Sequence, residues 1–155
     1  MEIKGLVNQF RNAINIAKDV GEFDDDFSFY RFPHGCCGDT SCLLGQYLLE
    51  NDIKTYYVYG TYRNGRFGNF QSHAWLQTTE QTIIDITGDQ FRTNSEFFYY
   101  DIPVYIGMKD RFHRLFEVEE RNIRESVNLD DLGGMCQPRL NELYGKIIKY
   151  IFYLK

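Results

Sequence analysis

Residues 33–49 read PHGCCGDTSCLLGQYLL, a run of small and turn-forming residues that passes directly into a helical pattern of apolar residues. The pattern places Cys37 where a loop becomes a helix, and it predicts that this helix runs to about Glu50 before Asn51-Asp52 ends it. The N–H groups of a first helical turn and the positive end of the helix dipole stabilise a negative charge. A thiol there ionises more readily than a free cysteine, whose pKa is about 8.5. Cys37 is therefore the candidate nucleophile.

A second pair of segments carries the residue types that a thiol nucleophile needs. SHAWLQ at residues 72–77 and TIIDIT at residues 82–87 read as strands joined by a short polar link. His73 and Asp85 are an even number of positions apart, so their side chains share one face if the strands pair antiparallel. A turn centred on Thr79 would set the imidazole directly opposite the carboxylate, with Cβ atoms about 5 Å apart. This register predicts a hydrogen bond between His73 and Asp85.

Length and composition indicate one domain over residues 1–155. The chain has 155 residues, of which 43% are hydrophobic, which is enough for one sizeable core. The net charge is −5 and no block of lysine or arginine is present, which argues against a nucleic-acid or anionic-membrane partner. We therefore expect no nucleic-acid or membrane partner, and a peptide, a protein or a small molecule instead. With Cys37 as a nucleophile, we expect a peptide or protein substrate and no cofactor.

The compartment is predicted from the start of the chain and from the cysteines. No apolar segment follows the opening MEIK, and no run approaches the roughly 20 apolar residues of a membrane span. These features predict a cytoplasmic protein. In the cytoplasm Cys36, Cys37, Cys42 and Cys136 would be reduced, so a disulfide framework is not expected.

The remaining chain predicts helices at both ends and strands between them. Helical spacing of apolar residues covers residues 3–20 and 138–153. Strands are predicted at 55–62 and around 102–107, with Asn64-Gly65 as a hairpin turn, whereas residues 110–136 give no clear assignment. The order of elements predicts an α+β fold in which the nucleophile helix packs on a central antiparallel sheet.

Three motifs in this order resemble a known family. GCCGDTS at residues 35–41 matches the G-x-C-x-D-x-(A/S) nucleophile motif of transglutaminase-like cysteine proteins. His73-Ala74-Trp75 resembles their H-A-W strand, and IDIT at residues 84–87 is similar to their D-x-T strand. The resemblance covers about a third of the chain. It implies a papain-like fold and selects Cys37 over Cys36 as the nucleophile, since Cys37 has the motif's Gly and Asp two positions away on either side.

The chemistry of these residues is that of a Cys-His-Asp triad. His73 would take the proton of Cys37, Asp85 would hold the imidazole tautomer, and the Cys37 backbone N–H would stabilise the developing oxyanion. Asp89 is an alternative third member, but it lies beyond the predicted strand. Arg31 stands where papain-like enzymes have a glutamine before the cysteine, so the second oxyanion donor is left unassigned.

Two groups of residues could instead form a metal site. Asp24-Asp25-Asp26 lacks the central glycine and distal glutamate of a calcium loop, so it predicts a solvated acidic turn. His34, Cys36, Cys37 and Cys42 are all zinc-ligand types, but the adjacent cysteines suit one tetrahedral ion poorly and a second short-spaced pair is missing. We therefore assign no metal and interpret Cys36 and Cys42 as structural.

The hypothesis is thus a cysteine protease, deamidase or amide transferase acting through Cys37, His73 and Asp85. His34 and Trp75 are the candidate substrate-binding residues, although His34 also fits a solvent-facing loop and Trp75 also fits the core. The alternative is a catalytically inactive papain-like binding or immunity module, for which Cys37 would be unreactive. His113 has no partner that the sequence identifies.

Overall fold

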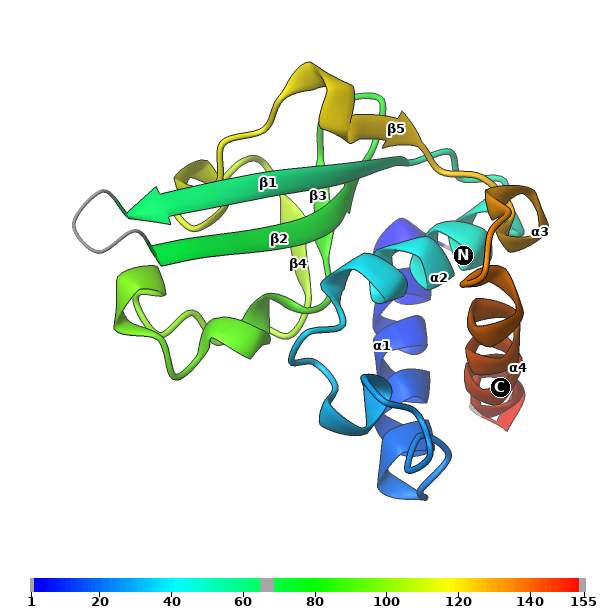
Figure 1. The fold of residues 1–155 in the computed structure, drawn as a ribbon. Helices are drawn as coiled ribbons and strands as arrows, with labels where there is room; N and C mark the ends of the chain where they lie inside the picture. The colour runs from blue at the N-terminus through cyan, green and yellow to red at the C-terminus, as the bar shows by residue number, and fades with distance from the viewer. Residues whose placement is uncertain (1, 65–68, 154–155) are drawn as a thin grey trace.

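A computed structural model describes residues 2–64 and 69–153 of the chain. It has an α+β fold in which helices pack against a five-stranded antiparallel sheet (Figure 1). The helices are α1 (Ile3–Asp19), α2 (Cys37–Leu49), α3 (Leu129–Leu132) and α4 (Gln137–Tyr153). The strands are β1 (Tyr56–Asn64), β2 (Asn69–Gln77), β3 (Ile83–Asp85), β4 (Tyr105–Gly107) and β5 (Ile123–Glu125). Their order in the sheet is β4-β3-β2-β1-β5.

The helical layer confirms the three long helices that the apolar spacing predicts. In Figure 1, α1 and α4 run side by side with α2 beside them, and contacts join all three pairs. The face of α1 that carries Phe10 and Ile14 is fully buried in this layer. Burying one such side chain contributes about 1.5–3 kcal/mol, so the helical core fixes the position of α2 and of its first residue, Cys37.

A second core lies on the other face of the sheet. Val58 and Trp75 pack there with four phenylalanines from the connections around β4: Phe91, Phe97, Phe112 and Phe116. The close approach depends on Gly60, because a Cβ at that position would lie 2.7 Å from the Cβ of Phe116. Gly60 pairs with His73 across the β1–β2 ladder, so the same small residue lets aromatic rings cover His73.

The β2–β3 register differs from the prediction. Leu76 pairs with Ile84, which moves the pairing by two residues and leaves Asp85 diagonal to His73 rather than directly opposite it. The link between β2 and β3 is longer than the sequence predicts. It is closed by a hydrogen bond from Thr78 N–H to Thr82 O, and Gln81 within it adopts a φ of 65°. A shift by two keeps the alternation of side chains, so His73 and Asp85 still share one face.

The segment without a sequence assignment holds β5, α3 and two short 3-10 helices, His113–Leu115 and Glu120–Asn122. The predicted Asn64-Gly65 turn falls partly on residues 65–68, outside the described residues.

The acidic turn at residues 24–26 is not simply solvated, because Asp26 is paired with Arg139 of α4 and accepts hydrogen bonds from the Ser28 and Phe29 backbone N–H groups. Within the described ranges, no helix is both long and apolar enough to span a membrane.

Candidate active site

Cys37 is the first residue of α2, as the sequence predicts. The preceding residue, Cys36, makes no side-chain cap to the helix, so the first-turn N–H groups are not satisfied by a capping side chain. The opposite face of the helix is anchored by Leu43, Leu44 and Leu48, each 1% exposed or less. A half-buried thiol is thereby held at a rigid, positively polarised helix end.

The pKa of Cys37 lies below its ordinary value. Burial alone would raise this pKa, but a hydrogen bond with the His73 ring, the charge of that ring and the Ala74 backbone N–H together outweigh the burial. Ala74 can make this contact because β3 pairs with β2 only at Leu76 and Gln77, which leaves the next part of the β2 edge open. The open part of the β2 edge therefore includes Ala74, the residue that follows His73.

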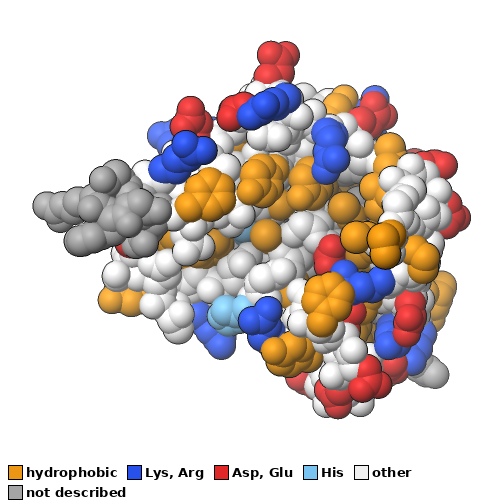
Figure 2. All heavy atoms as spheres, in the orientation of Figure 1, with side chains coloured by type: hydrophobic (Ala, Val, Ile, Leu, Met, Phe, Trp, Pro, Cys, Tyr) orange, Lys and Arg blue, Asp and Glu red, His pale blue; other side chains and the backbone are white. Residues whose placement is uncertain are grey.

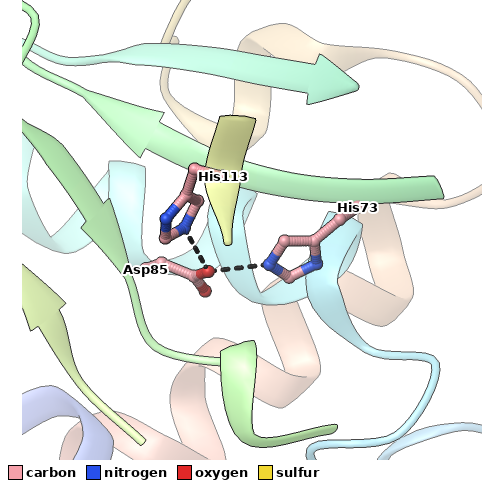
Figure 3. A group of neighbouring side chains, drawn as sticks. All are labelled: His73, Asp85 and His113. Atoms are coloured by element: carbon pink, nitrogen blue, oxygen red, sulfur yellow. Dashed lines mark hydrogen bonds and ion pairs between the residues drawn. The ribbon is translucent and has the colours of Figure 1, made fainter. Parts of the chain in front are cut away.

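His73 is held by Asp85, as Figure 3 shows. The Nε2 atom of His73 lies 2.7 Å from Oδ2 of Asp85, and the two side chains are 0% and 1% exposed. Burial would lower the pKa of His73, but the charge and hydrogen bond of Asp85 raise it. Burial would likewise raise the pKa of Asp85, but His73 and a second histidine lower it. The other carboxylate oxygen of Asp85 accepts the Thr87 N–H at 2.9 Å.

The second histidine is His113, which sequence reasoning left without a role. Its Nε2 lies 2.9 Å from the same Asp85 oxygen that contacts His73 (Figure 3), and its Nδ1 lies 2.6 Å from Oδ1 of Asp110. Its side chain is 0% exposed. The only signal in the sequence is the D-x-x-H spacing of Asp110 and His113, because Asp85 is 28 residues away along the chain.

Gln90 is a further site residue that the sequence analysis missed. It lies in the short 3-10 helix Gly88–Phe91 that follows β3. Its Nε2 is 3.3 Å from Nδ1 of His73 and donates to Thr87 O at 3.0 Å. The neighbouring Asp89, the alternative third triad member, is instead in a two-point ion pair with the buried guanidinium of Arg11.

The two candidate substrate-binding residues lie in different surroundings. Trp75 is 2% exposed and packs its ring against His73 and His113, at centroid distances of 5.7 and 5.1 Å. His34 is half-buried in the loop before α2, and its carbonyl accepts the Cys36 thiol at 3.3 Å. Trp75 therefore shields the imidazoles from solvent, and a contact of either residue with substrate stays a prediction.

The other cysteines near the site are not activated. Cys36 is fully buried in the helical core, and burial raises its pKa to about 11. Burial also raises the pKa of Cys42 to about 11. Of Cys36, Cys37 and Cys42, only Cys37 has a lowered pKa. Cys37 is also the cysteine that the nucleophile motif selects.

The part of the chain that the structure describes has one cluster of metal-ligand side chains, formed by His73, Asp85 and His113. It is not the set of His34 and three cysteines considered from the sequence. Two ligands on a tetrahedral zinc with bonds of about 2.1 Å are about 3.4 Å apart. The separations of 2.7 and 2.9 Å here are hydrogen-bond lengths. The residues present therefore fit a hydrogen-bonded chain better than a metal cage.

Tyr57 lies near the start of α2 and lines two cavities, neither of which has Cys37 or His73 in its lining. A Cβ on Gly38 would lie 3.3 Å from the Tyr57 hydroxyl, so this phenol lies against the first turn of α2. Tyr57 lines two cavities of about 240 and 330 Å³, the first shared with Cys42 and Leu132 and both shared with Arg124. Figure 2 shows a row of hydrophobic side chains above a hollow in this face, with basic side chains beside them.

Compared with known proteins, the chain matches no family model, no curated protein and no solved structure.

Proposed function

We propose that this chain is a transglutaminase-like cysteine enzyme with a papain-like fold, which attacks a peptide or protein amide through Cys37, His73 and Asp85. The observation that carries the proposal is the buried contact of 2.7 Å between His73 and Asp85, together with the position of Cys37 at the start of α2. The pKa of Cys37, which the His73 ring lowers, supports it. A thiolate at pH 7 is the nucleophile that this chemistry requires.

The reaction follows from the positions of the proton and the thiolate. Cys37 Sγ attacks the amide carbonyl carbon and forms a C–S bond, and the carbonyl oxygen takes the negative charge. The His73 imidazolium then gives its Nδ1 proton to the leaving amine as the C–N bond breaks, which leaves a thioester on Cys37. Water completes a hydrolysis, and an amine completes a transfer.

Gln90 supplies the second oxyanion donor that the sequence left unassigned, beside the Cys37 backbone N–H. Its amide is half-buried, donates to Thr87 O and lies 3.3 Å from Nδ1 of His73. It can donate to Nδ1 only when that nitrogen carries no proton, so while His73 is an imidazolium the second amide N–H of Gln90 is directed to the carbonyl oxygen of a bound substrate. A pre-oriented N–H donor of this kind stabilises an oxyanion with little reorganisation.

The cavities beside Tyr57 are the proposed binding surface for the acyl part of the substrate. Arg124 lies over the Tyr57 ring at 4.9 Å and lines both cavities. The first cavity combines Tyr57 and Leu132 with Glu125 and Asp131, which suits an apolar or aromatic substrate residue. The second is lined by Arg121 and Arg124 and, among the described residues, by no acidic side chain, which suits an acidic neighbour. His34, in the loop before α2, is kept as a candidate substrate-binding residue.

The test is the formation of an acyl-enzyme. The protein is incubated with p-nitrophenyl acetate at pH 7, and the modified residue is located by mass spectrometry. The proposal predicts rapid acetylation of Cys37, retained in Cys42→Ala and slowed at least about tenfold in His73→Ala. Acetylation of Cys37 no faster than that of the exposed Cys136 would contradict the enzyme proposal and favour an inactive binding module.

A further inference from the structure

We infer that His113 is a doubly protonated positioning residue, which donates Nε2–H to Asp85 and Nδ1–H to Asp110 and so extends the triad into a buried chain of five residues. Its protonation state is argued from hydrogen bonds alone. Only its effect on the thiol rests on the proposed function.

Asp110 accepts two hydrogen bonds besides its contact with the His113 ring. Its Oδ1 accepts the His113 backbone N–H at 2.8 Å and lies 2.6 Å from His113 Nδ1. Its Oδ2 accepts the Tyr100 hydroxyl at 3.3 Å. The His113 backbone N–H and the Tyr100 hydroxyl stabilise an ionised carboxylate, so Asp110 accepts from Nδ1 rather than donating to it.

Asp85 is likewise surrounded by donors. Oδ1 accepts the Thr87 backbone N–H, while Oδ2 faces His73 Nε2 and His113 Nε2. Asp85 therefore accepts from His113 as well. Since a neutral imidazole carries only one N–H, both contacts of His113 can be hydrogen bonds only if the ring is an imidazolium.

Charge balance supports this assignment. His73, Asp85 and His113 are at most 1% exposed, and the Asp110 side chain is 23% exposed. Two imidazolium rings and two carboxylates cancel in charge, so a thiolate at Cys37 brings the five residues to one negative charge, which a low-dielectric interior tolerates better than two. With a neutral His113, the five residues would carry two negative charges, and one short N···O contact would be left without a proton.

His113 therefore fixes the carboxylate of Asp85 in place and offsets part of its negative charge. His113 and Thr87 hold the two oxygens of Asp85 from different sides, which aims Oδ2 at His73. The cation on His113 also favours a thiolate at Cys37 by offsetting the negative charge of Asp85. Removing that cation should therefore raise the apparent pKa of the thiol.

The groups that face His113 come from four parts of the fold. Asp85 belongs to β3, His73 to β2 and Asp110 to the loop before His113 itself, while the Tyr105 ring of β4 stacks at 5.2 Å. Tyr100 approaches at 6.2 Å, and burial raises its pKa, so it remains a neutral donor to Asp110.

The direct test is long-range ¹H–¹⁵N NMR of the uniformly labelled full chain at pH 7, with the three histidines assigned through His34→Ala and His113→Gln. We expect both ring nitrogens of His113 to carry protons. In Asp110→Asn the ring should lose one proton at a lower pH than in the wild type. A neutral His113 tautomer at pH 7 would overturn the inference, whether or not Cys37 proves reactive.

Two further measurements complete the test. In His113→Gln, which keeps a donor for Asp85 but removes the charge, alkylation of Cys37 by iodoacetamide at pH 6 should slow at least about threefold through the raised thiol pKa. An unchanged pH profile in a folded His113→Gln protein would contradict the positioning role. Stoichiometric metal in the purified protein, measured by mass spectrometry, would overturn the inference in favour of a His73–Asp85–His113 metal site.

Discussion

His73 Nε2 lies 2.7 Å from Asp85 Oδ2, and both side chains are shut off from solvent. A buried imidazolium is costly unless a carboxylate compensates its charge, so Asp85 is the group that lets His73 hold a proton next to the thiol. The proposed reactivity of Cys37 therefore depends on the contact between His73 and Asp85, in which the thiol itself takes no part.

Replacing the nucleophile should remove activity without unfolding the protein. Cys37→Ala deletes one half-buried sulfur at a helix end, so the free energy of unfolding should change by no more than about 1 kcal/mol. Acyl transfer to the chain should disappear. Urea unfolding and the acetylation assay check both statements, with Cys42→Ala as the matched control; residual acylation at the wild-type rate would exclude Cys37.

Asp85→Asn should reduce both rate and stability. An amide in place of Asp85 leaves two buried imidazoles without their carboxylate, which should cost about 3–5 kcal/mol of unfolding free energy. Loss of the preferred His73 tautomer should lower the acylation rate by about a thousandfold or more. Steady-state rates on the folded variant, verified by circular dichroism, test this; an unaffected rate would mean that another group orients His73.

Arg11 should be as important for the fold as any core residue. Its guanidinium donates to Ile86 O, Asp89 and Pro103 O, and thereby ties α1 to the segment that carries Gln90. Arg11→Ala leaves Asp89 buried and unpaired, so unfolding free energy should fall by about 3–5 kcal/mol. Chemical denaturation measures this loss. Substitution of the exposed Arg31 by Ala is the control, and an equal effect there would contradict the account.

Asp26 should make stability depend on pH in the acid range. Burial would raise its pKa, but the hydrogen bonds from Arg139 and from two backbone N–H groups lower it to about 2. The unfolded value is about 3.9, so this stabilisation is full above about pH 4 and is lost as pH falls towards 2. Denaturant unfolding between pH 2 and 5 should show a smaller acid-side decline in Asp26→Asn than in the wild type. The exposed Asp24→Asn serves as control, and identical slopes in all three proteins would refute the assignment.

Local patterns in the sequence were sufficient for the long helices and for the contact between His73 and Asp85. The apolar spacing within α1, α2 and α4 is set by neighbours in the chain, and the even spacing of His73 and Asp85 survives a register shift of two. The size of that shift could not be predicted, because Gln81, a residue without turn preference, adopts the left-handed conformation that lengthens the link.

The rest of the site depends on contacts between distant parts of the chain. The segment after Asp110 is rich in charge and has no periodicity, and its β5 is defined by pairing with β1 rather than by its own residues. His113 reaches Asp85 only because the second aromatic core folds this segment over the sheet. Gln90 is placed by the Arg11–Asp89 pair, which joins residues 78 positions apart.

The most direct test of the central claim is the pH dependence of iodoacetamide labelling, mapped by mass spectrometry over all four cysteines in the wild type and in His73→Ala. The account predicts that Cys37 alone labels rapidly below about pH 7, and that it loses this advantage when His73 is removed. Labelling of Cys37 no faster than that of Cys36, Cys42 and Cys136, or rapid labelling that persists without His73, would contradict it.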